Sequence, residues 1–159
     1  MLKEFDGISS HHMKIRIARE NDAPAIATFN MLLAEETEQM ILDQKTVLAG
    51  VTALLTDVSK GFYLVAEENS TIIGQAMISV EWSDWRNKPI WWVQSVFVQK
   101  EWRHKGIFTK LLRTIQQQAR ARGVAFLRLY AHQKNLSARH TYEKTGWIQD
   151  PYKIYHHSI

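Results

Sequence analysis

A short basic turn that opens a helix is the part of the chain whose residue types and spacing most directly allow chemistry. It contains, in order, Arg103, His104, Lys105 and Gly106. An apolar strand ending at Val98 precedes it, and an amphipathic helix follows. The first turn of a helix carries N–H groups without intrahelical partners and the positive end of the helix dipole, which together bind anions. Residues 104–109 therefore predict a main-chain nest for a pyrophosphate-like group; the alternative is an ordinary glycine-containing loop before a helix.

A tyrosine on the next predicted helix is the second candidate for chemistry. That helix begins at Asn135 and is closed by Gly146, in the position where a left-handed residue commonly ends a helix. Tyr142 stands seven residues after Asn135, about two helical turns, so the two side chains lie near one face. A phenol placed in this way can donate a proton to a leaving group. Its alternative role is to pack the helix against a sheet.

Strands and helices that alternate from Met13 onward must position these two segments. Asn21-Asp22-Ala23-Pro24 and Asp43 are helix-start signals, and Glu68-Asn69-Ser70 is a hairpin turn between two β-rich runs. In chain order we expect a strand at 15–17, a helix to about 40, a helix from about 43 to before 61, strands at 62–66, 71–80 and 90–98, a helix at about 105–122, a strand at 124–131, a helix at about 135–145 and a last strand at about 152–156.

The two segments and the order of elements resemble the GCN5-related N-acetyltransferase (GNAT) superfamily. Its pattern at the basic turn is Arg or Gln, two residues, Gly, one residue, then Gly or Ala. Arg103 and Gly106 match, whereas Phe108 departs at the last position, which main-chain binding tolerates if the ring points into the core. The resemblance spans about Met13 to His156. It implies an α/β fold, a single GNAT-like domain with a mixed central sheet, helices on both faces and the order β-αα-βββ-α-β-α-β.

By this resemblance, the chain moves an acetyl group from acetyl-CoA to an amine. In the superfamily, the strand before the basic turn separates from the next strand, and its main chain pairs with the pantetheine arm. Asn135 resembles the Asn that hydrogen-bonds the cofactor, and its alternative role is that of a helix cap. The cofactor-binding residues so implied are Val96, Phe97, Val98, Arg103, His104, Lys105, Gly106, Ile107, Phe108, Thr109, Asn135 and Tyr142.

Acetyl transfer to an amine needs a proton for the departing thiolate and an uncharged nucleophile. Tyr142 matches the tyrosine that the family uses as general acid. Many relatives carry a Glu four residues before the last Val of the pre-turn strand, where this chain has Gln94, and others carry a Glu five residues before the helix Asn, where this chain has Tyr130. Gln cannot accept the proton. Four acidic residues remain as a base or a water relay, or as plain solvated charges, and the sequence selects none of them: Glu81, Asp84, Glu35 and Glu36.

Tryptophans gather in and beside the predicted hairpin that ends near residue 98. Strand alternation places Trp92 on the face of Gln94 and Trp91 on the other face. Aromatic rings can hold an amine by cation–π contact, which makes this region the candidate acceptor site. Large residues in a core or a dimer seam are the alternative. The candidate acceptor-binding residues are Trp82, Trp85, Trp92, Gln94 and Tyr130.

Composition bounds the remaining properties. The 159 residues fit one domain, expected at 13–159 after a loose leader at 1–12. The absence of Cys excludes disulfides, a thiolate nucleophile and Cys-ligated metal, and we expect no metal site. No apolar run approaches the roughly 20 residues of a membrane-spanning helix, so we expect a soluble cytoplasmic protein. The net charge of +4 comes from Lys and Arg spread among acidic residues, which argues against nucleic acid as a partner.

The sequence therefore predicts an acetyl-CoA-dependent N-acetyltransferase in which a primary amine attacks directly in a ternary complex. The alternative is a non-catalytic acyl-CoA-binding regulator of the same fold, which the missing carboxylates support and Tyr142 opposes. The acceptor, which the sequence leaves open, is a small amine, an amino acid, an antibiotic or a protein terminus. By the resemblance, we expect a homodimer, as is common in the superfamily.

Overall fold

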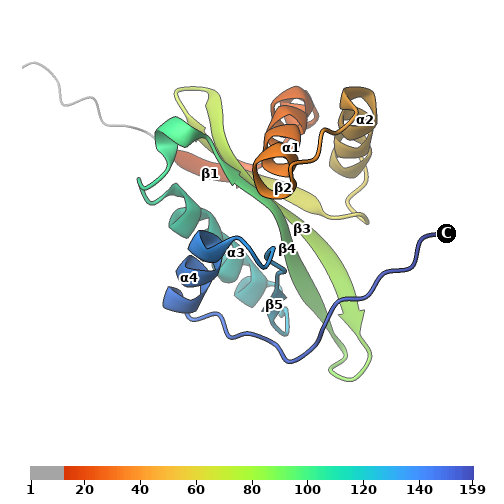
Figure 1. Cartoon of the computed structure of the whole chain (residues 1–159). Coiled ribbons are helices and arrows are strands. Elements are labelled where there is room, and N and C mark those ends of the chain that lie inside the picture. Colours follow the sequence, from red (N-terminus) through yellow and green to blue (C-terminus); the bar gives the residue numbers. More distant parts are fainter. Residues whose placement is uncertain (1–12) are drawn as a thin grey trace, which may run out of the picture.

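A five-stranded sheet with the order β1-β2-β3-β4-β5 forms the centre of the computed structural model, which describes residues 13–159. The leader predicted at 1–12 lies outside the described residues. Neighbouring strands from β1 to β4 are antiparallel and β5 is parallel to β4, so the sheet is mixed, as predicted. The elements are β1 (Lys14–Ile17), the 3-10 helix η1 (Glu20–Asp22), α1 (Ala23–Glu38), α2 (Gln44–Leu55), β2 (Phe62–Glu68), β3 (Thr71–Ser83), β4 (Lys88–Val98), the 3-10 helix η2 (Lys100–Trp102), α3 (Ile107–Ala121), β5 (Leu127–Arg128) and α4 (Leu136–Lys144) (Figure 1).

Helices cover both faces of the sheet, which confirms the predicted α/β architecture (Figure 1). On one face, α1 and α2 pack against β2 through a cluster that includes Ile26, Val51 and Leu54. On the other face, α3 packs against the sheet and α4 lies beside α3. The core face predicted for α3 is confirmed, because its four periodic residues are at most 3% exposed: Ile107, Leu111, Leu112 and Ile115. No helix within residues 13–159 is long and apolar enough to cross a membrane.

Several helices and turns begin or end at the residues that local sequence signals predict. The Asp43 carboxylate accepts a hydrogen bond from the Thr46 amide at the start of α2. Asn69 and Ser70 have φ angles of 48° and 63°, the left-handed pair that joins β2 to β3 in a two-residue hairpin. Gly146 has φ 88° just after α4. Each of these features depends on a few neighbouring residues, which explains why the sequence reveals them.

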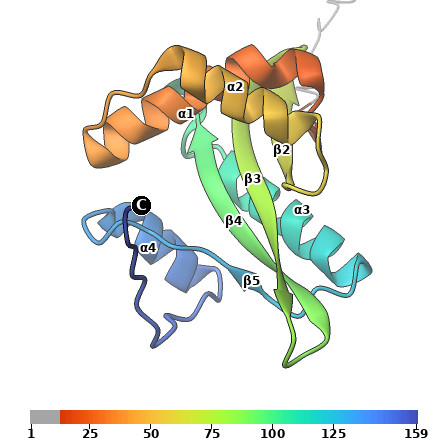
Figure 2. The ribbon, with the colours of Figure 1, turned by 90° about the vertical axis from the view of Figure 1, so that its right-hand side faces the viewer.

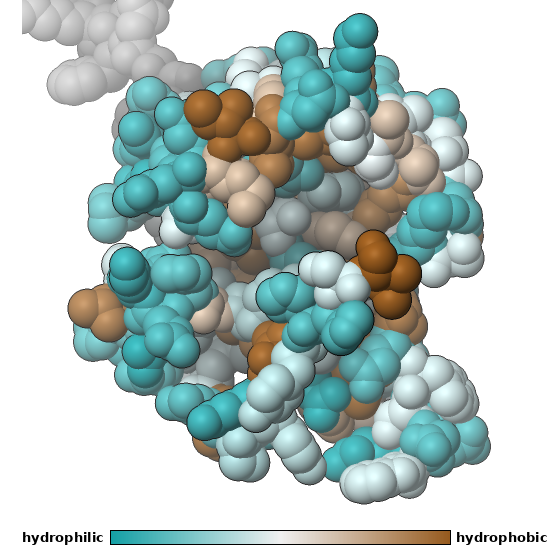
Figure 3. Space-filling model, turned by 45° about the vertical axis from the view of Figure 1, so that its right-hand side comes forward, coloured by the Kyte–Doolittle hydropathy of each residue, from teal (hydrophilic) through white to brown (hydrophobic). Residues whose placement is uncertain are grey.

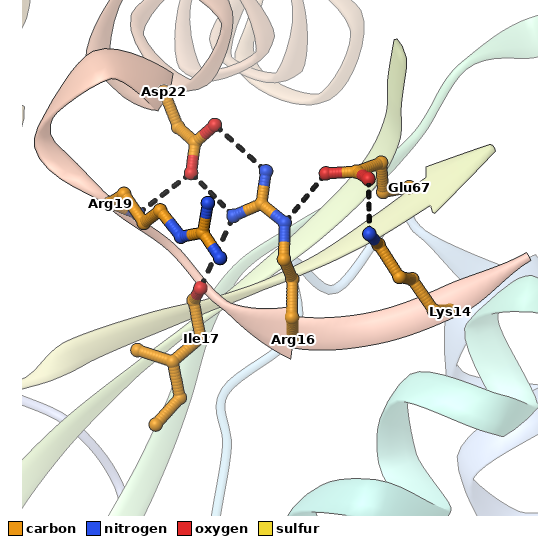
Figure 4. Close-up of polar contacts among 6 residues, drawn as sticks. All are labelled: Lys14, Arg16, Ile17, Arg19, Asp22 and Glu67. Carbon is orange, nitrogen blue, oxygen red and sulfur yellow. Dashed lines mark hydrogen bonds and ion pairs between the residues drawn. The ribbon is translucent and has the colours of Figure 1, made fainter. Parts of the chain in front are cut away.

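α1 begins at the predicted helix-start signal, with Asp22 as the residue before it, but the Asp22 side chain makes no capping hydrogen bond to this helix. Its carboxylate instead accepts hydrogen bonds from two guanidinium nitrogens of Arg16 at 2.7 and 3.0 Å and from the Arg19 amide at 2.7 Å (Figure 4). Arg16 also donates to Glu67 at 2.6 Å, and Lys14 lies 2.7 Å from the same carboxylate. This ion network joins β1, β2 and the start of α1. The Arg16 guanidinium lowers the pKa of Asp22 from its usual value.

A β-bulge interrupts β4 before its end. Gln75 of β3 pairs with Phe97, and Met77 pairs with Gln94, so β4 contains one residue more than β3 in this interval. Ser95 lies in the bulge with φ 47°, an uncommon left-handed conformation for a residue other than glycine. A bulge shifts the alternation of side chains along its strand. Side chains before and after the bulge therefore reach the faces of the sheet in a different order from that of an unbroken strand.

The last predicted strand is wrong. Residues 152–156 form no strand, and Tyr152, Ile154 and Tyr155 are 76%, 68% and 87% exposed. The strand predicted at 124–131 is also shorter in the structure, where β5 contains only Leu127 and Arg128. Aromatic and β-branched residues favour a strand locally, but a strand also requires a partner edge. β5 is too short to offer an edge to a further strand.

Candidate active site

The start of α3 has the geometry of an anion nest. Gly106 is the residue before the helix, with φ 79°, and His104 has φ 61°. No side chain caps this end, and the first intrahelical bond runs from the Lys110 amide to the Gly106 carbonyl at 3.0 Å. The N–H groups of Ile107, Phe108 and Thr109 therefore lack intrahelical acceptors. A Cβ added at Gly106 would meet nothing within 4 Å, so the space beside the nest is open to a phosphate.

The cations of the basic turn contact other elements. Arg103 donates from Nε to the Val98 carbonyl at 2.9 Å and pairs with Glu36 of α1 at 2.7 Å. The Lys105 ammonium lies 4.8 Å from the centre of the Trp102 ring. The structure thus uses Arg103 to join the end of β4 to α1. The main-chain N–H groups of the nest are the anion-binding groups that its geometry supports best.

Tyr142 lies in contact with the first turn of α3. Its ring centre is 5.6 Å from that of Phe108 and 5.8 Å from that of Trp147. Phe108 packs against the core with Tyr142, so the residue that departs from the family pattern directs its ring into the core. Burial raises the pKa of the Tyr142 hydroxyl above the ordinary value of a phenol, which makes it a weaker acid.

Asn135 caps α4, as one of its two proposed roles requires. Its side-chain oxygen accepts the Ala138 amide at 3.1 Å. The amide nitrogen of an Asn side chain carries two donors in addition to that acceptor. The cap therefore leaves Asn135 chemically able to donate to a ligand as well.

β4 and β5 pair over only two positions. Trp91 pairs with Leu127 and Trp92 with Arg128, after which β5 ends while β4 continues to Val98. Figure 2 shows the two strands together at one end and apart toward the other, with α4 beside the open side. This is the separation that the resemblance predicts for the cofactor arm.

The bulge sets the direction of the main-chain groups at this open edge. The Gln99 amide donates to the Ile73 carbonyl of β3 at 2.9 Å. Main-chain groups alternate between the two edges of a strand, so those of Phe97 also face β3. Those of Val96 and Val98 face the opposite edge, beyond the end of β5. Of the three residues expected to pair with the arm, Val96 and Val98 have the favourable orientation.

The two positions where relatives carry Glu adjoin one another on the α1 side of the sheet. The Tyr130 hydroxyl donates to the Gln94 side-chain oxygen at 3.1 Å, and the Gln94 nitrogen donates to the Ser79 hydroxyl at 2.6 Å. The rings of Trp92 and Tyr130 are 5.8 Å apart. The structure thus brings Trp92, Gln94 and Tyr130 into one cluster, whose hydrogen bonds replace the carboxylate found in relatives.

The other acidic candidates have partners of their own. Glu81 accepts from the Trp92 indole at 2.6 Å and lies 3.4 Å from Arg128. Glu36 binds Arg103, and Asp84 accepts the amide of Trp85 at 2.9 Å in the hairpin between β3 and β4. Glu35 is exposed on α1. None of these contacts directs a carboxylate toward Tyr142.

The ring of Trp92 is not free to bind a cation from solution, because a guanidinium of the chain already lies against it. The guanidinium of Arg128 lies 5.7 Å from the Trp92 ring centre and 5.0 Å from that of Phe126. It therefore occupies a cation–π position that was predicted for the acceptor amine. Trp82 and Trp85 are 61% and 87% exposed, and together with Glu81, Asp84 and Phe126 they line a separate cavity of about 320 Å³ at the hairpin between β3 and β4.

A hollow crosses the face of the molecule between the α1 side and the α4 side (Figure 3). At the end of α1 it contains a cavity of about 470 Å³, lined by Glu38, Tyr130, Ala131, His132, Gln133, Lys134 and Ile154. Sequence reasoning identified only Tyr130 among these residues. The position of 131–134 between a strand and the Asn135 helix is the signal that would have found four of the others, whereas Glu38 and Ile154 come from distant segments. No cluster of three or more His, Asp or Glu residues in the described part of the chain could hold a metal ion.

Comparisons with known proteins identify the family of this chain. The model of the acetyltransferase (GNAT) family matches residues 17–147, so the chain belongs to this family and is an acetyltransferase. Uncharacterized N-acetyltransferase YhfO of Bacillus subtilis (strain 168) is 32% identical over 139 residues, which cover 87% of this chain and 91% of YhfO.

Two solved structures illustrate the fold. A possible acetyltransferase from Clostridium difficile 630 is 40% identical, with a TM-score of 0.88, and the match covers 92% of this chain and 97% of that one. A predicted acetyltransferase from Clostridium acetobutylicum, solved with acetyl-CoA, is 22% identical with a TM-score of 0.75, and the match covers 91% of this chain and 96% of that one.

Proposed function

We propose that this acetyltransferase uses acetyl-CoA and transfers the acetyl group to a primary amine, which attacks directly in a ternary complex. One observation carries the proposal. The contact between Phe108 and Tyr142 joins the anion nest of α3 to a partly buried phenol, beside the edge where β4 leaves β5. A phosphate site, a main-chain edge and a proton donor thus adjoin in one place. The Clostridium acetobutylicum structure with acetyl-CoA supports the choice of donor.

In this proposal, each part of the cofactor has a matching part of the chain. The N–H groups at 107–109 bind the pyrophosphate, and the main-chain groups of Val96 and the amide of Val98, whose carbonyl already accepts from Arg103, pair with the pantetheine arm. Asn135 donates its side-chain nitrogen to the arm. When bound, acetyl-CoA supplies a thioester that is activated toward amines.

Tyr142 completes the transfer as general acid. As the amine nitrogen bonds to the carbonyl carbon and the carbon–sulfur bond breaks, the Tyr142 hydroxyl gives its proton to the departing sulfur. A phenol carries this proton at neutral pH, and because burial raises the pKa of Tyr142, the proton transfer depends on the developing charge of the departing sulfur. The amine must lose its own proton to water, because Gln94 and Tyr130 occupy the positions of the family's carboxylates.

The missing carboxylate also favours a class of acceptor. An α-amino group has a pKa of about 7.7 to 8.0, whereas a Lys side chain has a pKa of about 10.4. A site without a strong base favours the first class, so we propose an acceptor whose amine is partly neutral near pH 7. The homodimer and the cytoplasmic location remain predictions from the sequence.

An amine panel tests the proposed function. Purified protein is incubated with acetyl-CoA and amino acids, peptides with free termini, polyamines or aminoglycosides, and the release of CoA is followed. Steady release with an amine, and acetylated product by mass spectrometry, supports the enzyme. Tight binding of acetyl-CoA without release for any amine would instead support the acyl-CoA-binding regulator.

A further inference from the structure

The bulge at Ser95 is a strained feature of the strand proposed to bind the cofactor arm. Its φ of 47° is uncommon for serine. Backbone conformations of this kind persist only where the surrounding structure holds them. Because the bulge determines which edge Val96 and Val98 face, whatever holds Ser95 also sets the direction of their main-chain groups.

Three side chains from three elements surround this bulge beneath α1. Gln75 of β3 donates from Nε2 to the Ser95 carbonyl at 3.2 Å and to the Asn30 side-chain oxygen of α1 at 2.7 Å. Asn30 in turn donates to the Tyr63 hydroxyl of β2 at 3.0 Å. That hydroxyl also lies within hydrogen-bonding reach of the Ser95 side chain.

Burial makes these hydrogen bonds important for the conformation of the bulge. Gln75 is fully buried and Tyr63 is 3% exposed. A buried polar group that loses its hydrogen-bond partner cannot form a hydrogen bond with water instead. Each side chain of the network therefore holds its neighbour in place. The Oε1 atom of Gln75 has no hydrogen-bond partner among the described residues, so the two bonds from Nε2 are the contacts that account for an amide here.

We propose that Asn30, Tyr63 and Gln75 are positioning residues for the cofactor. They hold the bulge at Ser95 and so direct the main-chain groups of Val96 and the amide of Val98 toward the amide-rich arm of acetyl-CoA. None of the three is expected to contact the reacting atoms. The inference rests on the proposed function for its ligand, but the state of Ser95 can be measured without any ligand.

The first test replaces Gln75 by Leu. Acetyl-CoA affinity is measured by calorimetry below the unfolding transition, and the three-bond HN–Hα coupling of Ser95, which reports φ, is measured by NMR. The apparent Kd rises as the fraction of molecules that keep the Ser95 conformation of the wild type falls. We expect this fraction to fall to about one tenth, so the apparent Kd should rise about tenfold. The matched control is Gln118→Leu, the same change at a part-buried amide about three turns along α3 from the nest, which should leave both values unchanged.

A rescue separates positioning from simple stabilisation. Glycine adopts positive φ without strain, so the double variant Gln75→Leu/Ser95→Gly should recover most of the acetyl-CoA affinity. A general loss of packing would not be repaired in this way. If Gln75→Leu fails to fold, Tyr63→Phe keeps the ring and removes only the hydroxyl that joins Asn30 to Ser95.

The outcomes are distinct. Weaker binding with a changed Ser95 coupling, restored by Ser95→Gly, supports the inference. Folded Gln75→Leu and Tyr63→Phe proteins that bind acetyl-CoA like the wild type overturn it, as does a loss that Ser95→Gly leaves in place. Wild-type protein that binds no acetyl-CoA refutes the proposed function, and the Ser95 coupling in the variants still decides whether the network holds the bulge.

Discussion

Replacing Asp22 by Asn tests whether the ion network at the start of α1 stabilises the fold through charge. The carboxylate receives two guanidinium bonds from Arg16 and one main-chain bond from Arg19. Asn has nearly the same shape and keeps one oxygen acceptor. The substitution therefore removes the negative charge and one acceptor while it preserves the packing.

The expected loss follows from what remains around Arg16. Removing one partner of a buried ion pair costs about 3 to 5 kcal/mol when the other charge is left alone. Arg16 is not left alone, because Glu67 still accepts its Nε at 2.6 Å and the Arg16 side chain is 18% exposed. We therefore expect a loss near the value of one charged hydrogen bond, about 2 kcal/mol of unfolding free energy. For a chain of this length, that corresponds to a fall in Tm of about 6 °C.

The dependence on pH gives the sharper test. Because Arg16 lowers the folded-state pKa of Asp22, the carboxylate contributes stability above its unfolded pKa and loses it as pH falls through the folded value. Urea unfolding of the wild type and Asp22→Asn should differ by the full amount at pH 7, begin to converge below about pH 4, and meet only below the lowered folded-state pKa of Asp22. Asp57→Asn, the same change at an exposed pair with Lys60, serves as the control and should give a smaller loss. A difference equal at pH 3 and pH 7, or one no larger than that of the control, would refute the reasoning.

Three further predictions concern the active site. Tyr142→Phe should bind acetyl-CoA as before and lose turnover by roughly 10²- to 10⁴-fold in steady-state kinetics, whereas full activity would assign Tyr142 to packing alone. Gly106→Val should reduce the increase in Tm caused by acetyl-CoA, because a β-branched residue is strained at φ 79°. Unchanged acetyl-CoA affinity in the folded variant would contradict the assignment of the phosphate nest. The rate with a fixed acceptor should rise with pH toward the acceptor's own pKa, and Gln94→Glu should lower the apparent pKa of the profile. A limb near pH 6 to 7 shared by acceptors of different pKa would instead reveal a base elsewhere.

The amino-acid sequence by itself determined the features that short stretches of chain control. The Asp43 cap, the Asn69-Ser70 hairpin and the left-handed Gly146 all appear where the sequence places them. The core face of α3 was also predictable, because the period of apolar residues defines which side of a helix is buried, whereas the helices on both faces of the sheet were expected from the resemblance. The open nest at Gly106 belongs to the same class of local feature.

Only the tertiary structure decided the features that join distant segments. The partners Tyr130 and Gln94 are 36 positions apart and Arg103 and Glu36 are 67 apart, so no local pattern pairs them. The structure also placed Arg128 over Trp92, where the sequence suggested an acceptor amine.

The sheet shows the same limit of local information. The residues at 152–156 have strand-like composition, yet the short β5 leaves them without a paired edge. The bulge at Ser95 likewise depends on β3 and on side chains from α1 and β2. Register and bulges are set by cross-strand contacts and burial, which local propensity does not encode, and they decide which main-chain groups of β4 face the proposed cofactor.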